Sequence, residues 1–490
     1  MRCAERFSVR GFAAAVVAWG ALAAAALAAG AKNVIVLIGD GAGFNSFRAL
    51  AMYEGKWNAA TGKPDYVYAG RDWIATAATT YPLSTATKPT GAQRQDASLV
   101  YDPVEAWRQT PVCVKDARSF AGYQWLMRAA TDSAAAATAL AAGVKTYNSA
   151  INWSDDDKPL LGRSLPELAK ARGKACGVVT SVPWSHATPA GLGGAHNRDR
   201  DQYEQIAREM LDAATLDVIV GAGNPDFDDN GRPVAKHNPK DVAKAFQYVG
   251  GQGTWEQLAS GRHPAGWTLV QTKADFEALA RGDKRPPARL LGVPQVYSTL
   301  QQARAKFHAT DTPYYHPPNR NVPDLATLSR AALAALEADP DGLYLMIEGG
   351  AIDWAEHAKQ PARLIEEQAD FHRAIEAVVA WVERKSNWNE TLVIVTADHE
   401  TGLIWGPNAD KTPFDPLVDR GRGTMPGMLY LHKSHTNSLT PVFARGPLSE
   451  RLASLAEKTD ARAGAAWGFS GRYLDNTDIF RVARDAIVGH

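Results

Sequence analysis

The chain has 490 residues, with 53 Lys and Arg against 53 Asp and Glu, so its formal net charge is zero. This length is enough for one large α/β domain with insertions or for two domains. Balanced charge without a long run of one sign excludes the pattern of a nucleic-acid-binding surface and that of a charged interaction tail.

The N-terminal segment has the pattern of a secretory signal. Arginines in MRCAERFSVR precede an apolar, alanine-rich stretch at residues 11–29, and residues 26–28 (ALA) offer a small-residue cleavage site. An uncleaved membrane anchor is the alternative, because the stretch approaches the length that spans a bilayer. We expect residues 1–28 to be a signal peptide, residues 29–490 to form one mature domain without a membrane span, and the protein to be periplasmic or secreted.

Five apolar runs predict buried strands, and helical patterns lie between them. The strands are expected at residues 33–39, 173–180, 217–223, 342–350 and 391–400. Helices are expected at 164–173, which opens with a capping-box pattern, and at 360–385, where apolar residues recur at helical spacing. The alternation predicts an α/β fold: a three-layer sandwich with a large, mostly parallel central sheet flanked by helices.

Residues 225–340 differ in composition from the rest of the chain. They are richer in Pro, Gly and charged residues and carry little strand signal, so we expect an insertion or cap on the same domain. Within them, DFDDNG has the opening acids of a calcium-binding EF-hand loop, but His237 stands where that loop needs its glutamate. The motif is therefore interpreted as an acidic turn.

The stretch TDSAAAATAL, residues 131–140, places Ser133 at the expected start of an alanine-rich helix. One interpretation is helix capping, because Thr, Asp and Ser are all good capping residues. The other is chemical: a helix N-terminus has free N–H groups and a positive dipole end, which suit a bound anion that a serine can attack.

Acidic and histidine residues follow several of the expected strands. Asp353 and His357 in EGGAIDWAEH are four apart, so a helix places both on one face, where they suit zinc. Asp398 and His399 follow the strand at 391–400 and precede a turn signal. In isolation each is equally an ordinary surface pair or the start of a polar loop.

Two further candidates come from loops. Asp40 lies between glycines in GDG, where an acid would repel a dinucleotide pyrophosphate and is better interpreted as a metal ligand. His435 lies in KSHTNS, three residues after His432. Ligands of open α/β sheets bind at the carboxyl ends of the strands, so these residues are expected to meet there.

In their order along the chain, these motifs resemble the alkaline phosphatase family, over nearly all of the mature chain. The motifs are GDG, TDSAAAATA, HATPAGLGGAHNRDR, EGGAIDWAEH, TADHE and HTNS. The resemblance implies hydrolysis of small phosphate monoesters to alcohol and inorganic phosphate at alkaline pH, through a phosphoserine intermediate. It also implies two Zn²⁺ ions, one Mg²⁺ ion and a possible homodimer.

The resemblance assigns a role to each candidate residue. Ser133 is the implied nucleophile, and Arg200, with Arg198 as the alternative, is the implied phosphate-binding arginine. The implied metal ligands fall in three groups: Asp40, Asp398 and His399 for the zinc beside Ser133; Asp353, His357 and His435 for the other zinc; Asp40, Thr188 and Glu348 for magnesium.

Two positions depart from what several family members carry. His186 stands near the implied magnesium site where some members have aspartate, and a nitrogen ligand favours zinc or cobalt over magnesium. His186 is kept as a candidate metal ligand, and the identity of the third metal is open. Trp354 replaces a cationic residue, so we expect phosphate to be held less tightly.

Other functions were weighed against this one. A sulfatase of the same superfamily needs C/S-x-P-x-R, which TDSAAAA lacks. Phosphodiesterase relatives generally lack the third metal site, whereas Thr188 and Glu348 are present here. A secreted phosphate-binding protein would lack the nucleophile or a ligand. Cys113 and Cys176 can pair in an oxidising compartment, but spacing does not show that they are close.

Overall fold

The computed structural model describes residues 30–489 except 115–116, 129, 236, 238–239, 305–307 and 309–311. The expected signal peptide therefore lies outside the described residues. Within them, no helix is long and apolar enough to cross a membrane.

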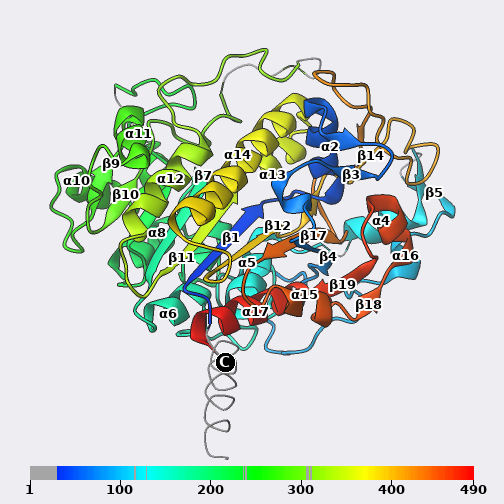
Figure 1. The fold of residues 1–490 in the computed structure, drawn as a ribbon, viewed down its shortest axis with the longest axis horizontal. Helices are drawn as coiled ribbons and strands as arrows, with labels where there is room; N and C mark the ends of the chain where they lie inside the picture. The colour runs from blue at the N-terminus through cyan, green and yellow to red at the C-terminus, as the bar shows by residue number, and fades with distance from the viewer. Residues whose placement is uncertain are drawn as a thin grey trace, which may run out of the picture.

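A central sheet of eleven strands dominates the described part of the chain (Figure 1). From β12 to β9 every neighbouring pair is parallel, while β17 runs antiparallel to both its neighbours. This confirms the predicted mostly parallel sheet. In spatial order the strands are β18 (Lys458–Thr459), β19 (Arg472–Asp475), β4 (Ile74–Thr79), β17 (Thr440–Arg445), β12 (Thr391–Thr396), β1 (Asn33–Gly39), β11 (Leu343–Gly349), β7 (Ala175–Pro183), β8 (Val218–Ala222), β10 (Leu290–Gly292) and β9 (Thr268–Val270).

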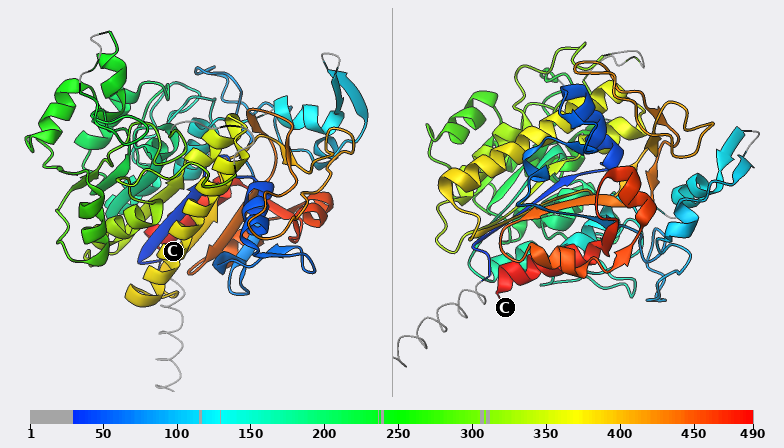
Figure 2. Two further views of the ribbon diagram at one scale, coloured as in Figure 1. Left: turned by 90° about the horizontal axis from the view of Figure 1, so that it is seen from above. Right: turned by 45° about the vertical axis from the view of Figure 1, so that its right-hand side comes forward.

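Helices cover both faces of the sheet, because its central strands are apolar on both sides (Figure 2). Ile35 and Leu37 of β1 pack into one apolar core, and Val34, Val36 and Ile38 pack into the other. The first face carries α2 (Phe44–Glu54), α11 (Lys273–Arg281), α12 (Leu325–Leu336), α13 (Ala351–His357) and α14 (Pro361–Lys385). The second carries α5 (Ser133–Ala142), α6 (Leu165–Lys170), α7 (Ala187–Leu192), α8 (Tyr203–Asp212), α9 (Val242–Phe246), α10 (Gln252–Ala259), α15 (Glu450–Leu455) and α17 (Asn476–Val488). The predicted three-layer sandwich is confirmed.

The region 225–340 carries more regular structure than its composition predicts. Its strands β9 and β10 extend the central sheet beyond β8, and α12 packs against β7 in the same core. Each of these two strands has three residues, too few to produce a pattern in the sequence. The extent of the predicted insertion stays a prediction, but part of it belongs to the sheet.

A smaller apolar cluster lies at the β18 side, with a hairpin that projects from the body (Figure 2). Cys113 is exposed on this hairpin, whereas Cys176 is buried on β7, and both thiols are free. The cluster contains α3 (Pro103–Ala106), α4 (Ala121–Arg128) and α16 (Ala461–Trp467); the hairpin is β5 (Pro111–Val114) with β6 (Ala117–Phe120). The remaining short elements are β2 (Trp57–Asn58), β3 (Lys63–Pro64), β13 (Glu400–Thr401), β14 (Ile404–Trp405), β15 (Leu429–Tyr430), β16 (His435–Thr436), η1 (Val67–Ala69) and η2 (Gln247–Val249).

Candidate active site

The acidic residues predicted at strand ends meet at one edge of the sheet. β12, β1, β11 and β7 are consecutive neighbours, and Glu348 of β11 pairs in register with Ile38 of β1 and Thr180 of β7. Asp40 follows β1 directly, and Asp398 follows β12. The carboxyl ends of these parallel strands therefore bring together side chains that are up to 358 positions apart in the chain, as open α/β sheets do at their binding sites.

One group of ligand atoms consists of Asp353, His357 and His435. The Nε2 atoms of the two imidazoles are 3.0 Å apart, and they lie 3.3 and 3.4 Å from Asp353 Oδ1. Each Nδ1 donates to a backbone carbonyl, that of Lys433 at 2.7 Å for His357 and that of Thr131 at 2.8 Å for His435. With Nδ1 as the donor, a neutral ring at either position would turn its Nε2 lone pair to the same point. A metal cation there gives both lone pairs and the carboxylate a common partner.

A second group lies deeper and contains more carboxylates. His399 Nε2 lies 3.2 Å from Asp398 Oδ2 and 3.5 Å from Asp40 Oδ1. Asp40, Asp353 and His399 together also converge closely enough to hold a metal ion. The rings of His399 and His435 stack with centroids 3.6 Å apart, so the two groups adjoin.

Gly41 allows this close approach of β1 to α13. Its φ is +75°, a left-handed conformation that glycine adopts without strain. A Cβ at this position would lie 2.9 Å from the Cα of Asp353 and 2.9 Å from Thr401 Oγ1. The Gly41 N–H also donates to Asp398 Oδ1 at 3.1 Å, which orients that carboxylate.

Ser133 is the first residue of α5 and lies against the second group. Its Oγ is 3.2 Å from His399 Nε2, and the residue is 2 % exposed. The helix cap is Asp132, whose side chain accepts from the N–H of Ala135, so Ser133 itself does not cap the helix. Ser133 opens onto a cavity of about 800 Å³ that also reaches Arg200, Trp354 and the first ligand group.

The structure separates the two candidate arginines. Arg200 lines the cavity, and its Nη1 donates to Asp132 Oδ2 at 3.1 Å. Arg198 has a side chain that is 61 % exposed and pairs with Asp157 at 3.0 Å. Only Arg200 is held beside Ser133, by the carboxylate that also caps the helix of Ser133.

A third group of oxygen atoms adjoins Asp40. Thr188 Oγ1 donates to Asp40 Oδ2 at 3.3 Å, and Glu348 lies within hydrogen-bonding reach of both. Thr180 donates to Glu348 Oε2. These oxygens match the hard ligands that magnesium prefers.

His186 lies near this group but not among the converging ligand atoms found in the described residues. Its ring centroid lies 5.8 Å from that of Tyr203 and 5.6 Å from that of Trp354, and its buried Nδ1 forms no hydrogen bond with any residue that the structure describes. Burial, with the charge of Arg200 next, lowers the pKa of His186 to about 3. The ring is therefore neutral and keeps a free lone pair.

The carboxyl groups of the site do not ionise easily without a cation. Burial raises the pKa of Asp398 and that of Glu348 to about 7, and burial together with Asp398 raises that of Asp40. Burial would also raise the pKa of Asp353, but the imidazoles beside it hold it well below its usual range. Three buried oxygens, Asp40 Oδ1, Asp398 Oδ2 and Glu348 Oε1, have no hydrogen-bond partner within the described chain. The donor set thus fits bound divalent cations, which would satisfy these atoms.

Sequence reasoning missed the residues that orient the ligands. Thr401 donates to Asp353 Oδ1 at 2.7 Å and lies 3.3 Å from His399 Nδ1, so one hydroxyl contacts both groups. Asp132 was interpreted only as a capping residue, although it also binds Arg200. Thr401 comes two residues after His399, but its spacing carries no signal of this role. The acidic turn at Asp226 to Asn230 does not converge on a metal position with three ligand side chains in the described structure.

The fold and the site define a class: an α/β sandwich with a serine at a helix start, beside two groups of Asp and His ligand atoms and an arginine. The sequence model of the alkaline phosphatase family matches residues 121–416, more than half of the chain. The chain belongs to the alkaline phosphatase family.

Curated relatives agree with this placement, and solved structures share the fold. Alkaline phosphatase 4 of Bacillus subtilis is 33 % identical over 287 residues, which cover 57 % of this chain and 52 % of the relative. The chain thus spans about half the length of this relative. Alkaline phosphatase of Escherichia coli K12 is 29 % identical over 370 residues, which cover 67 % of this chain and 72 % of the relative. Alkaline phosphatase from the Antarctic bacterium TAB5 has the same fold, with a TM-score of 0.58 and 22 % identity; the match covers 94 % of this chain and 98 % of that protein. A variant of the TAB5 protein was solved with Mg bound in its M3 site.

Proposed function

We propose that the protein hydrolyses phosphate monoesters at alkaline pH through a phosphoserine on Ser133. The observation that carries the proposal is the convergence of two imidazole Nε2 atoms and one carboxylate oxygen, within 3.4 Å of one another, in the cavity onto which Ser133 and Arg200 open. Family membership supports the reaction class, and small phosphomonoesters are the proposed substrates.

Ser133 and Arg200 would perform the covalent steps. The guanidinium of Arg200 holds two non-bridging oxygens of the phosphoryl group, for which its planar fork is suited. Ser133 Oγ attacks phosphorus and loses its proton to solvent, the bond to the leaving alcohol oxygen breaks, and the alcohol takes up a proton from water. Water then attacks the phosphoserine, which releases inorganic phosphate and restores the hydroxyl.

The two ligand groups suit zinc, whose ligands are imidazole and carboxylate. Asp40, Asp398 and His399 would hold one ion, and Asp353, His357 and His435 the other. Bound there, the two ions would lower the pKa of the serine hydroxyl and stabilise the charge on the leaving oxygen.

Magnesium is proposed for the third group, formed by Asp40, Thr188 and Glu348. The oxygen-only donor set supports it, and a mutant of a protein of the same fold was solved with Mg bound in its M3 site. His186, two positions before Thr188, lines the cavity, and its buried Nδ1 forms no hydrogen bond with a described residue, so zinc remains the alternative for this position. Export to the periplasm or beyond and dimerisation stay predictions.

The deciding experiment is hydrolysis of p-nitrophenyl phosphate by wild type and Ser133→Ala, after chelation and after Zn²⁺ and Mg²⁺ are added back. Activity that requires metal and is lost in Ser133→Ala, but kept in the exposed control Ser98→Ala, is expected. Absence of activity in fully metal-loaded wild type would contradict the proposal. Faster turnover of bis-p-nitrophenyl phosphate would instead indicate a phosphodiesterase.

The arginines provide a matched pair. Arg200→Ala should raise KM and lower kcat/KM by about 10²-fold, because a charge-assisted contact to phosphate is lost. Arg198→Ala should change kcat/KM less than about twofold, since its side chain is exposed. Equal losses in both variants would reassign the phosphate contact.

A further inference from the structure

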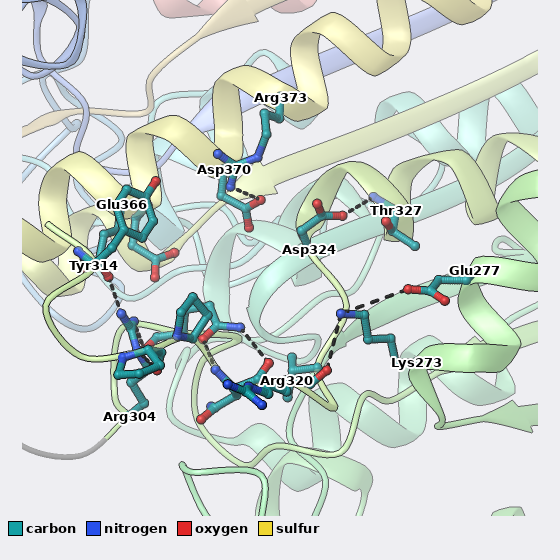
Figure 3. Close-up of a pocket in the computed structure, with 16 residues that line it drawn as sticks. Lys273, Glu277, Arg304, Tyr314, Arg320, Asp324, Thr327, Glu366, Asp370 and Arg373 are labelled. Carbon is teal, nitrogen blue, oxygen red and sulfur yellow. Dashed lines mark hydrogen bonds and ion pairs between the residues drawn. The ribbon is translucent and has the colours of Figure 1, made fainter. Parts of the chain in front are cut away.

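A second cavity lies beside α14, separate from the one that contains Ser133 (Figure 3). Its volume is about 720 Å³, within the range of small-molecule sites. Its lining comes from the first half of α14, the starts of α11 and α12, and loop residues between 314 and 322. Gln302 lines the cavity of Ser133, and Arg304 lines the second cavity. The two cavities therefore share a wall but no lining residue.

Two carboxylates at the α14 wall, those of Glu366 and Asp370, accept hydrogen bonds from arginines and backbone N–H groups, although burial still raises the pKa of Asp370 to about 6. Glu366 Oε2 accepts from the buried side chains of Arg304, at 2.7 Å, and Arg363, at 2.8 Å, and Glu366 Oε1 accepts from the Tyr314 N–H at 2.6 Å. Asp370 accepts from Arg373 and from a backbone N–H at the start of α12, both at 3.1 Å. Each of the three arginines near this wall therefore donates a hydrogen bond to one of these two groups, while the charges of Arg304 and Arg363 also act on Glu367 and oppose the rise of its pKa.

Glu367 lies between Glu366 and Asp370 along α14, and none of these arginine hydrogen bonds is donated to it. It is 3 % exposed and lines the cavity, and its Oε1 forms no hydrogen bond with any described residue. Burial, with Asp370 and Glu366 next, raises the pKa of Glu367 to about 8. A buried carboxyl group that faces a cavity without a partner is costly unless a ligand supplies one.

The missing partner is not a metal ion. A metal site needs several ligand atoms at one point, and hard cations take six or more oxygens. In the described part of the chain, the groups of three or more ligand side chains that converge in this way lie at the site of Ser133. An organic cation, by contrast, needs one carboxylate and room for its body.

The other walls indicate the rest of the ligand. Tyr314, Pro317 and Pro318 line an apolar side. Figure 3 shows Arg320 and Lys273 across the cavity from Glu366 and Asp370. No described group forms an ion pair with the Arg320 guanidinium, which is exposed at this rim. The cavity thus offers a carboxyl group at its floor and a cation at its mouth.

We propose that this cavity binds a small zwitterionic amine of the basic amino acid class. Its ammonium or guanidinium group lies against Glu367, its methylene chain lies along Tyr314 and Pro317, and its carboxylate meets Arg320. The site is independent of the function proposed for Ser133.

The test is titration calorimetry of metal-loaded protein with L-arginine, putrescine, glutarate and CaCl₂. L-Arginine should bind in the micromolar to millimolar range of Kd, and putrescine at least about fivefold more weakly because it lacks the carboxylate. Glu367→Gln should weaken L-arginine binding at least about tenfold, the loss of one charge-assisted contact. The matched control Glu277→Gln, an exposed carboxyl group on the same rim, should change it less than about twofold.

Two further variants keep the proposal open to refutation if Glu367→Gln does not fold. Arg320→Gln should weaken L-arginine but not putrescine, and Ser133→Ala should bind both as wild type does. Absence of binding by both amines, Ca²⁺ binding that Glu367→Gln abolishes, or unchanged affinity in Glu367→Gln would each overturn the proposal. Loss of L-arginine binding in Ser133→Ala would also overturn it, by moving the amine to the other cavity.

Discussion

The two adjoining ligand groups differ in composition and in exposure. The side chains of Asp398 and His399 are 0 % exposed, whereas those of His357 and His435 are 37 % and 13 % exposed. Buried carboxylates need a cation to remain ionised, but imidazoles are stable as neutral rings without one. The comparison therefore predicts a tightly held ion in the carboxylate-rich group and an exchangeable ion in the imidazole-rich group.

Asp353→Asn is expected to have the largest effect, because Asp353 contributes to both groups. We expect kcat/KM to fall by at least about 10³-fold, with both ions lost, since the variant removes a ligand charge from one ion and a neighbouring charge from the other. Activity assays with metal analysis by mass spectrometry check this. Loss of one ion alone would show that the groups are independent.

His399→Ala and His357→Ala separate the two groups directly. Each should lower kcat/KM by about 10²-fold or more, the typical cost of disturbing a metal site. Millimolar zinc should partly restore His357→Ala, whose position is open to solvent, and should not restore His399→Ala. The comparison fails if His399→Ala is the variant that recovers.

The variant Trp354→Lys tests how a positive charge at the cavity changes the binding of phosphate. Trp354 lines the cavity beside His357, and a lysine there would add a positive charge near bound phosphate. The inhibition constant of inorganic phosphate should fall about threefold to tenfold, or roughly 1 kcal/mol. Trp354→Gln removes the ring without adding charge and should not reproduce the effect. An unchanged inhibition constant in Trp354→Lys would refute the expectation from the sequence.

The smallest expected effect is that of His196 on the free energy of unfolding, at a position away from both ligand groups. His196 lies between Glu209, at 3.0 Å, and Glu167, at 3.6 Å, in the loop that leads to Arg200. Burial opposes protonation, but the hydrogen bond to Glu209 and the nearby carboxylate of Glu167 outweigh it and raise the pKa of His196 to about 9.

Since this pKa is raised, the stabilisation is complete below about pH 6.5 and is lost as the pH rises through about 9. It amounts to at most about 3 kcal/mol in the free energy of unfolding. Urea unfolding of wild type and His196→Gln should differ at pH 6.5 and agree near pH 10. His263→Gln is a control, because burial lowers the pKa of His263. A difference that persists at pH 10 would show that packing, not charge, holds the loop.

Much of the fold followed from local patterns, and the misses were short or non-local elements. The strands β1, β7, β8, β11 and β12 and the helices α6 and α14 were expected within a few residues, because each is long and periodic. Strands β9 and β10 were missed, since three residues in a sheet gain their stability from neighbours that the local sequence does not show.

The candidate residues of the site were found through a resemblance, and their convergence is what the structure adds. Asp353 and His357 lie on one helix face, as the i, i+4 spacing predicted. The resemblance already placed Arg200 before Arg198, and the structure adds its contact with Asp132, 68 positions away. The roles of Thr401 and Glu367 were equally invisible, since each depends on which distant groups lie beside it.

By itself, the sequence determined the class of fold, the polar residues at the strand ends and the order of motifs that resembles one family. It could do so because period, capping and spacing are local properties of the chain. Only the tertiary structure decided which lone pairs face one point, which arginine lies beside Ser133, and which buried carboxyl group has no partner. Those properties depend on distances between segments far apart in the chain, and burial then determines how strongly each charge acts.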